Sequence, residues 1–216
     1  MIVRQEIPLE DWSVAGDDMP VHNVPHAAFL IDGRTTLMQM CCYFLRAQRS
    51  IYITAWGLSP QLLLVRGKHK RAGDDASQEQ EELLDWLRTK GLCDADLRFW
   101  QSDEELSVAN VLTYAVSKGV DVHVLLWDTY ALPFQDSPAK VQEILTPLGI
   151  LCLRDDSHMG LFNRPIQAHH QKTIVVDSRY AFVGGIDMMT DSDGDFDRWD
   201  TKGHPYHTPL RLDKDG

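Results

Sequence analysis

The sequence has few cysteines and no long apolar run. Its four cysteines among 216 residues form no C-x-x-C pair, which disfavours both a zinc site and a disulfide framework. No stretch approaches the roughly 18 apolar residues of a transmembrane helix. Three acidic residues stand among the first 12, where a signal peptide is basic and then apolar. We therefore expect a reduced, soluble, cytoplasmic chain that contacts membranes only peripherally.

Basic residues are also in deficit. The 21 Lys and Arg residues face 32 Asp and Glu residues, for a formal net charge of −11. A field of this sign repels polyanions, so no nucleic-acid partner is expected, although one phosphodiester could still bind in a locally basic pocket. The one basic cluster, Arg66–Arg71, could contact phosphates, but a short charged run between Gly and Asp is more often a solvated loop.

The hydropathy pattern is that of a globular domain, with 44% hydrophobic and 25% charged residues. The expected elements, from apolar spacing and β-branched runs, are a helix of about 15 residues after Asp32, strands at Ser50–Trp56, Val120–Trp127 and Gly149–Leu153, and helices at Gln78–Lys90, Glu104–Lys118 and Pro138–Leu148. This alternation predicts an α/β fold with a mostly parallel central sheet and helices on both faces. We expect a lead-in at residues 1–25 and one domain at 26–216.

The most informative stretch is A-H-H-Q-K-T-I-V-V-D-S-R-Y-A-F-V-G-G-I-D, at Ala168–Asp187. Its two apolar runs predict two short strands joined by a turn at residues 177–179. His170 and Lys172 are two residues apart, so in an extended segment their side chains leave the same face. An imidazole can attack phosphorus or protonate a leaving oxygen, while an ammonium balances charge on the phosphate oxygens. This pair suits a phosphate, and neither step needs a metal.

Glycines and carboxylates near this pair extend the candidate site. Gly184 and Gly185 follow the second predicted strand and let backbone N–H groups approach an oxyanion. Asp177 or Asp187 could orient the imidazole by accepting its second N–H. The adjacent His169 should point to the opposite face, where a packing role is expected.

Two other features support weaker interpretations. The acidic run Asp191–Asp197 has its glycine at the fourth position instead of the sixth position of an EF-hand loop, and no glutamate stands at the twelfth. We expect no metal and no cofactor. Trp56 and Trp127 end predicted strands and are expected to pack in the core or at its rim. Trp199 is the better tryptophan candidate for lining a substrate pocket.

The pattern H-x-K-x4-D, filled by His170, Lys172 and Asp177 and followed by the two glycines, resembles the signature of the phospholipase D superfamily. Chance gives this pattern roughly 0.04 times in a chain of this composition. Other segments resemble the first of the two motif-bearing halves of eukaryotic-type phospholipases D, namely Ala181–Asp187, Arg198–Asp200 and, more loosely, Ile51–Pro60 and Gly119–Asp128. The resemblance covers roughly residues 26–209.

This resemblance implies an αβα sandwich and a phosphodiesterase that hydrolyses or transphosphatidylates glycerophospholipids such as phosphatidylcholine. His170 would attack phosphorus to form a phosphohistidine, and a second histidine from the other half would protonate the leaving alcohol before water or an alcohol releases the product. Lys172 would bind phosphate oxygens, and Asp177 would be the motif acid that supports the geometry. Gly184, Gly185 and Asp187 would contact phosphate or substrate.

The sequence contains one HKD motif where the resembled enzymes have two, because no second H-x-K occurs. We expect the missing half either C-terminal to this segment or on a homodimer mate; the ending R-L-D-K-D-G favours a piece of a longer enzyme. The isolated chain could then be inactive. Two alternatives stay open: a nuclease or phosphatidyltransferase of the same superfamily, the former disfavoured by the net charge, and a noncatalytic module that binds lipid phosphate.

Overall fold

A computed structural model describes residues 26–70, 77–128, 136–156 and 169–190. The expected lead-in at 1–25, the acidic run and Trp199 lie outside the described residues. The helices are α1 (Gly33–Arg46), α2 (Ser77–Thr89), α3 (Asp94–Gln101), α4 (Val108–Ser117) and α5 (Pro138–Leu145), with 3-10 turns η2 (Gly67–His69) and η3 (Thr146–Leu148); the strands are β1 (Ser50–Ala55), β2 (Asp121–Trp127), β3 (Leu151–Asp155), β4 (Thr173–Val176) and β5 (Tyr180–Val183).

Side-chain caps set where several helices begin. Asp32 precedes α1, and its carboxylate accepts the Gly33 N–H at 2.7 Å. Ser107 caps α4 by accepting the Asn110 N–H, which is why this helix begins later than the expected Glu104. The helix α3 was not expected from the sequence; its signal is Asp96, whose carboxylate accepts the Cys93 N–H in a capping box.

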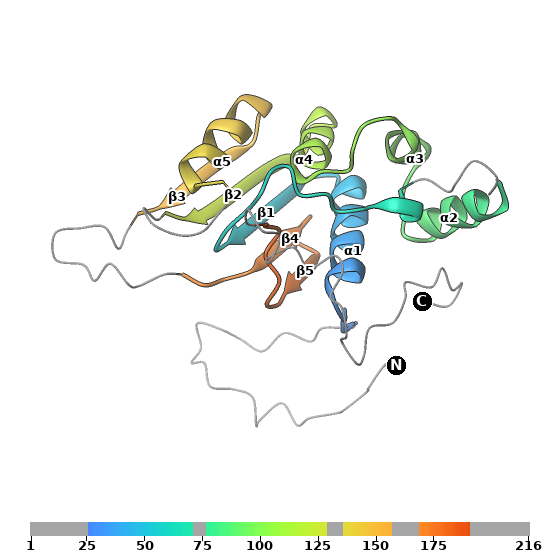
Figure 1. Cartoon of the computed structure of the whole chain (residues 1–216), viewed down its shortest axis with the longest axis horizontal. Helices are drawn as coiled ribbons and strands as arrows, with labels where there is room; N and C mark the ends of the chain where they lie inside the picture. Colours follow the sequence, from blue (N-terminus) through green and yellow to red (C-terminus); the bar gives the residue numbers. More distant parts are fainter. Residues whose placement is uncertain (1–25, 71–76, 129–135, 157–168, 191–216) are drawn as a thin grey trace, which may run out of the picture.

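The five strands form one mixed sheet in the order β3-β2-β1-β4-β5 (Figure 1). β1 pairs with β2, and β2 with β3, in parallel; β4 pairs with β1 and with β5 in antiparallel fashion. The α/β class is confirmed, but the sheet is half antiparallel instead of mostly parallel. The tight turn after β4 returns the chain as a hairpin and makes the β4–β5 pair antiparallel. The direction of β4 against β1 is set by pairing between distant segments, which the local pattern does not reveal.

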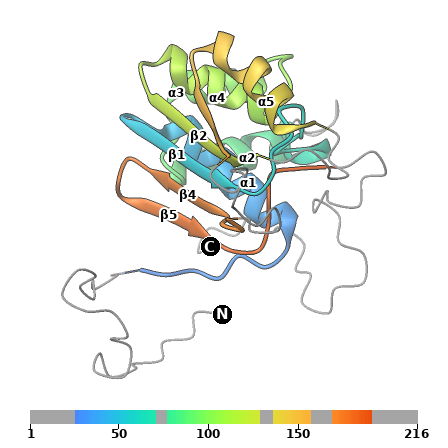
Figure 2. The same ribbon diagram turned by 90° about the vertical axis from the view of Figure 1, so that its left-hand side faces the viewer.

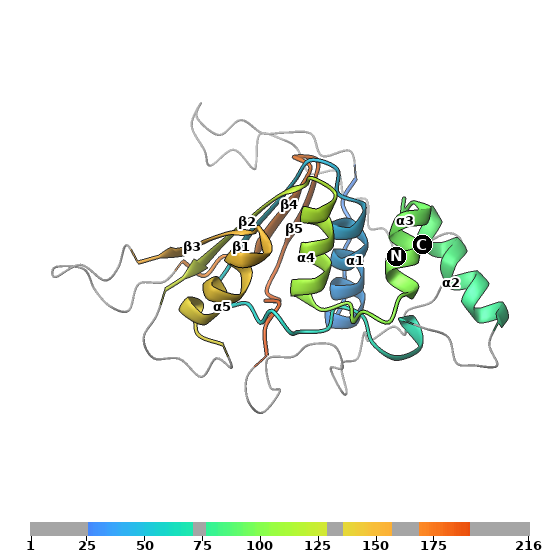
Figure 3. The ribbon, with the colours of Figure 1, turned by 90° about the horizontal axis from the view of Figure 1, so that it is seen from above.

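The helices that pack on the sheet lie on one face in the described part of the chain (Figures 2 and 3). The β1-to-β2 and β2-to-β3 connections both move the same way across the sheet. Because parallel crossovers are right-handed, both place their helices, α4 and α5, on the same side. Helix α1 packs beside α4 there, and α2 and α3 continue that side of the molecule (Figure 3). The expectation of helices on both faces is therefore wrong for the described residues.

The hydrophobic core lies between the sheet and these helices. Alternate strand residues such as Ile51, Ile53 and Val124 point into it, and so do Leu37 and Phe44 of α1. The residues between them in each strand point to the other face and are more exposed. Within the described residues, no helix combines the length and apolar character needed to cross a membrane.

Candidate active site

Three strand ends meet at one edge of the sheet and bring the candidate residues together. Trp56 follows the carboxyl end of β1, and Lys172 precedes β4, whose first residue pairs with Thr54. Gly184 follows β5, and its N–H donates to the Lys172 carbonyl at 3.3 Å. In α/β sheets, ligands bind at the carboxyl ends of the parallel strands.

A pocket of about 170 Å³ opens at this edge. Its lining combines polar groups, a glycine backbone and apolar side chains, contributed by Trp56, His170, Lys172, Gly185, Ile186, Asp187 and Met189. Of the six residues proposed as a site from the sequence, His170, Lys172, Gly185 and Asp187 therefore line one pocket. Gly184 lies next to it in the chain.

His170 and Lys172 are in direct contact, with 3.3 Å between the imidazole Nε2 and the ammonium Nζ. An ammonium can only donate, so this contact corresponds to the tautomer that carries its hydrogen on Nδ1 and keeps the lone pair on Nε2. The His170 side chain is exposed. An imidazole nitrogen and a cation are thus in contact, and the imidazole is open to solvent.

Asp187 links Lys172 to the end of β1. One carboxylate oxygen lies 2.8 Å from Lys172 Nζ, and the other accepts the Trp56 N–H at 3.3 Å. Both charged side chains are largely buried, with 9% exposed for Lys172 and 6% for Asp187. Burial raises the pKa of Asp187 above its ordinary value, because it outweighs the opposing effect of Lys172 and of the backbone N–H donors.

Trp56, like Met189, is a pocket residue that the sequence interpretation missed. Its ring meets the His170 imidazole edge to face, with centroids 5.2 Å apart, and Lys172 Nζ lies 5.5 Å from its centroid. The ring also stacks with that of Trp127, with centroids 6.1 Å apart. The signal in the sequence was its place at the carboxyl end of a strand. In α/β sheets, residues that directly follow the parallel strands form the ligand sites.

The segment after the glycines is tied to the loop that follows β1. The Ser59 N–H donates to the Met188 carbonyl at 2.8 Å, and the Thr190 N–H donates to the Ser59 hydroxyl at 3.0 Å. Met188 and Met189 are buried. These contacts fix Asp187 and Met189 against the pocket.

Asp177 does not lie in this pocket. It stands at the opposite end of β4, about 17 Å of extended chain from Lys172, in a turn where it adopts a positive φ of 55°. Its carboxylate accepts N–H groups of Gln48, Arg49 and Ser50 at 2.8–3.2 Å. Partial burial raises its pKa, but these backbone donors and the Arg49 charge outweigh burial and leave the pKa lowered. A supporting role fits this position, and direct contact with substrate does not.

The remaining predicted residues have clear positions. A Cβ added at Gly184 or Gly185 would meet no atom within 4 Å, so protein packing does not require either glycine, and Gly185 lines the pocket. Neither Asp177 nor Asp187 directs its carboxylate at His170 as the sequence suggested; Asp187 binds Lys172. His169 Nε2 faces Asp155 at 4.0 Å, away from the pocket lining.

The sequence is similar to those of several phospholipases D. The chain is 30% identical over 184 residues to phospholipase D beta 2 of Arabidopsis thaliana, and the match covers 79% of this chain and 17% of that protein. It is 28% identical over 179 residues to phospholipase D A of Dictyostelium discoideum (76% and 11%) and 28% identical over 176 residues to phospholipase D2 of Bos taurus (81% and 14%). No family model matches the chain.

The fold is an α/β sheet that carries a histidine and a lysine at the carboxyl ends of its parallel strands. The repeated similarity across most of its length shows that the chain belongs to the phospholipase D superfamily. The matched segment spans only 11%, 14% and 17% of the length of the three relatives named above.

Proposed function

We propose that this chain is the first motif-bearing half of a phospholipase D-like phosphodiesterase that acts on glycerophospholipids such as phosphatidylcholine. The observation that carries the proposal is the contact of His170 Nε2 with Lys172 Nζ inside a pocket of about 170 Å³. The names of the relatives support a phospholipid substrate. A phosphodiester supplied by a bilayer implies peripheral contact with a membrane, and we propose this location for an otherwise cytoplasmic protein.

The proposed chemistry proceeds in two displacements. The Nε2 lone pair of His170 attacks phosphorus, the N–P bond forms, and the P–O bond to the headgroup alcohol breaks. Lys172 balances the charge on the non-bridging oxygens, and the Gly185 backbone lies beside them. Water or a second alcohol then attacks phosphorus through its oxygen while its proton passes to the second histidine proposed below. The N–P bond breaks, which restores His170 and releases phosphatidic acid or a new phosphatidyl ester.

The first displacement requires a proton for the departing alkoxide. Lys172 is already paired with Asp187, and His170 is the nucleophile. We therefore propose that a second histidine, from a second motif-bearing unit, supplies this proton. Such a unit would lie either later in a longer polypeptide or on a second copy of this chain.

A substrate with a good leaving group tests the nucleophile without the second unit. A phosphatidyl ester of p-nitrophenol expels a stabilised anion that needs no protonation, so His170 alone should complete the first step. Rapid mixing should give a burst of nitrophenolate that approaches one equivalent per chain. Slow turnover should follow, and ethanol should divert the product to phosphatidylethanol.

Matched variants make the result specific. His170→Asn should abolish the burst, whereas His169→Asn, one residue away but turned toward Asp155, should keep it. A burst that survives His170→Asn would exclude the proposed nucleophile. If a nucleotide p-nitrophenyl diester gives a burst and this lipid ester does not, the substrate is a nucleic acid instead of a lipid. If the chain binds phosphatidylcholine vesicles but gives no burst with either ester, it is a noncatalytic module that binds lipid phosphate.

A further inference from the structure

Ser59 does not line the pocket, but it is bonded to the segment that carries two of the lining residues. It stands three residues after Trp56, in the loop that follows β1, and it is buried, with 2% exposed. Its N–H donates to the Met188 carbonyl at 2.8 Å. Asp187 and Met189, on either side of Met188, both line the pocket. A residue outside the pocket thus binds the backbone between two residues inside it.

The Ser59 hydroxyl makes a second, reciprocal connection to the same segment. Its oxygen accepts the Thr190 N–H at 3.0 Å, and the hydroxyl donates to the Thr190 carbonyl at 3.3 Å. Met188 and Thr190 flank Met189, so Ser59 holds the chain on both sides of this pocket residue. Because one hydroxyl donates and accepts at once, Ser59→Ala would remove both contacts to Thr190.

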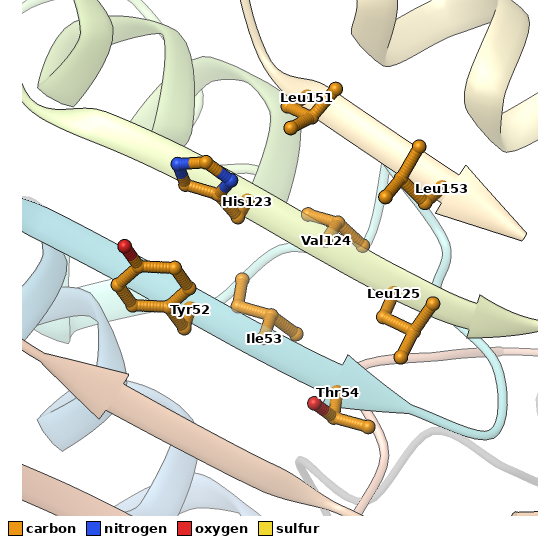
Figure 4. A pocket seen from close by; sticks show the side chains of 8 residues that line it. All are labelled: Tyr52, Ile53, Thr54, His123, Val124, Leu125, Leu151 and Leu153. Atoms are coloured by element: carbon orange, nitrogen blue, oxygen red, sulfur yellow. The ribbon is translucent and has the colours of Figure 1, made fainter.

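The loop that carries Ser59 is anchored at both ends. At its start, β1 lies between β2 and β4 in the sheet, and Figure 4 shows Thr54 of β1 beside its register partner Leu125 of β2. At its end, the N–H of Val108, the first residue of α4, donates to the Leu62 carbonyl at 2.9 Å. The first N–H groups of a helix have no acceptor within the helix, so this contact satisfies α4 and holds the loop. Ser59 therefore extends from a fixed support.

The segment that Ser59 holds depends on individual contacts for its position, because residues 184–190 form neither a helix nor a strand. The Asp187 carboxylate supplies one such contact by accepting the Trp56 N–H at 3.3 Å. The same carboxylate lies 2.8 Å from Lys172 Nζ. A shift of this segment would therefore change the surroundings of the Lys172 ammonium.

We propose that Ser59 is a positioning residue for the reaction. Its hydroxyl holds residues 187–190 in place, so that Asp187 keeps the Lys172 ammonium buried and in contact with His170. Groups that act on a transition state must be held in place before the substrate binds, and the residues behind them do this. The effect on the reaction rate rests on the proposed function, whereas the effect on Lys172 does not.

Amine labelling tests the position of Lys172 without any substrate. The 216-residue chain is treated briefly with sulfosuccinimidyl acetate, and the acetylation of each lysine is followed by mass spectrometry. Lys172 is 9% exposed and paired with Asp187, so in Ser59→Ala it should be acetylated roughly fivefold faster, the factor that one lost hydrogen bond gives. Lys118, which pairs with Asp96 away from the pocket, serves as the internal reference and should react at an unchanged rate.

The nitrophenolate burst from the phosphatidyl ester of p-nitrophenol tests the effect on the reaction. In Ser59→Ala the rate constant of the burst should fall roughly fivefold, while its amplitude stays near one equivalent per chain because His170 is still present. The matched control is Ser107→Ala, which removes an equally buried hydroxyl that caps α4 by accepting the Asn110 N–H. It should lower the melting temperature to a similar extent and leave both the Lys172 labelling and the burst rate unchanged.

The proposal is overturned if Ser59→Ala leaves the labelling rate of Lys172 unchanged, or if it accelerates Lys118 as much as Lys172, since the variant would then loosen the whole chain. It is also overturned if Ser107→Ala reproduces both effects, or if Lys172 is labelled faster and the burst rate does not change. If the unaltered chain gives no burst with any ester, the proposed function fails instead. Faster labelling of Lys172 alone in Ser59→Ala would then still support its placement through Ser59.

Discussion

Lys172 and Asp187 form a largely buried ion pair of 2.8 Å that joins the start of β4 to the segment after β5. The same ammonium contacts His170 Nε2, so one side chain connects the candidate nucleophile to the carboxylate behind it. Asp187 in turn holds the Trp56 backbone. The pocket is therefore organised around a cation that is positioned before any phosphate arrives.

The raised pKa of Asp187 predicts a particular dependence of stability on pH. A carboxyl whose pKa is higher in the folded chain binds its proton more tightly there, so its contribution is greatest below the ordinary pKa of about 4 and declines as pH rises through the raised value. Asp187→Asn has no such titration. The stability advantage of the unaltered chain over this variant should shrink as pH rises through this acid range, measured by urea unfolding.

The opposite trend is equally measurable. If that advantage grows as pH rises from about 4, then Lys172 dominates over burial and lowers the pKa of Asp187. A control at an exposed carboxylate, Asp94→Asn, should change the pH dependence little.

Asp177 is expected to matter for stability and not for the chemical step. Asp177→Ala removes the acceptor of three backbone N–H groups and should lower the free energy of unfolding by about 1–2 kcal/mol. Its lowered pKa also means that its contribution is present above the ordinary pKa and is lost as pH falls through the folded value. Thermal unfolding and the nitrophenolate burst, measured below the melting range, separate the two roles. Loss of the burst in a fully folded Asp177→Ala chain would contradict this assignment.

Trp56 is expected to position the His170 ring. Its edge contact is worth about 1 kcal/mol, so Trp56→Leu should slow the burst roughly fivefold to tenfold, while Trp56→Phe, which keeps an aromatic face, should recover most of the rate. A merely structural tryptophan would change the melting temperature without changing the burst rate of the folded protein. Stopped-flow mixing and calorimetry on the same samples decide between these outcomes.

Asp96 joins three groups away from the pocket. Its buried carboxylate accepts the Cys93 N–H and the Tyr114 hydroxyl and pairs with Lys118. Burial, and then the Asp96 charge, raise the pKa of Tyr114 well above its ordinary value. Asp96→Asn should lower this pKa, as seen by ultraviolet titration, and should destabilise the chain by about 3 kcal/mol. An unchanged tyrosine titration would refute the charge contribution.

Local patterns in the sequence were enough to predict most elements and to propose residues that the fold brings into one pocket. Alternation in Ser50–Trp56 and the paired runs around Asp177 predicted β1, β4 and β5 because period-2 burial is a local signal. His170 and Lys172 follow from their spacing in extended chain. The similarity to the superfamily agrees with this interpretation.

Long-range pairing is what the sequence could not supply. Whether β4 runs with or against β1 depends on contacts more than a hundred residues apart, so the half-antiparallel sheet was missed. The same holds for Trp56, whose role follows from its contact with His170. Asp177 is the opposite case. Its place in the H-x-K-x4-D motif predicted a position in the site, but its carboxylate accepts backbone N–H groups just after α1.

Detection of a covalent adduct tests the central claim most directly. The chain is mixed with the phosphatidyl ester of p-nitrophenol, quenched during the burst at alkaline pH, where phosphohistidine persists, and digested for mass spectrometry. The account predicts a phosphatidyl group on His170, absent from His170→Asn and retained in His169→Asn. An unmodified chain despite nitrophenolate release, or an adduct on any other residue, would contradict it.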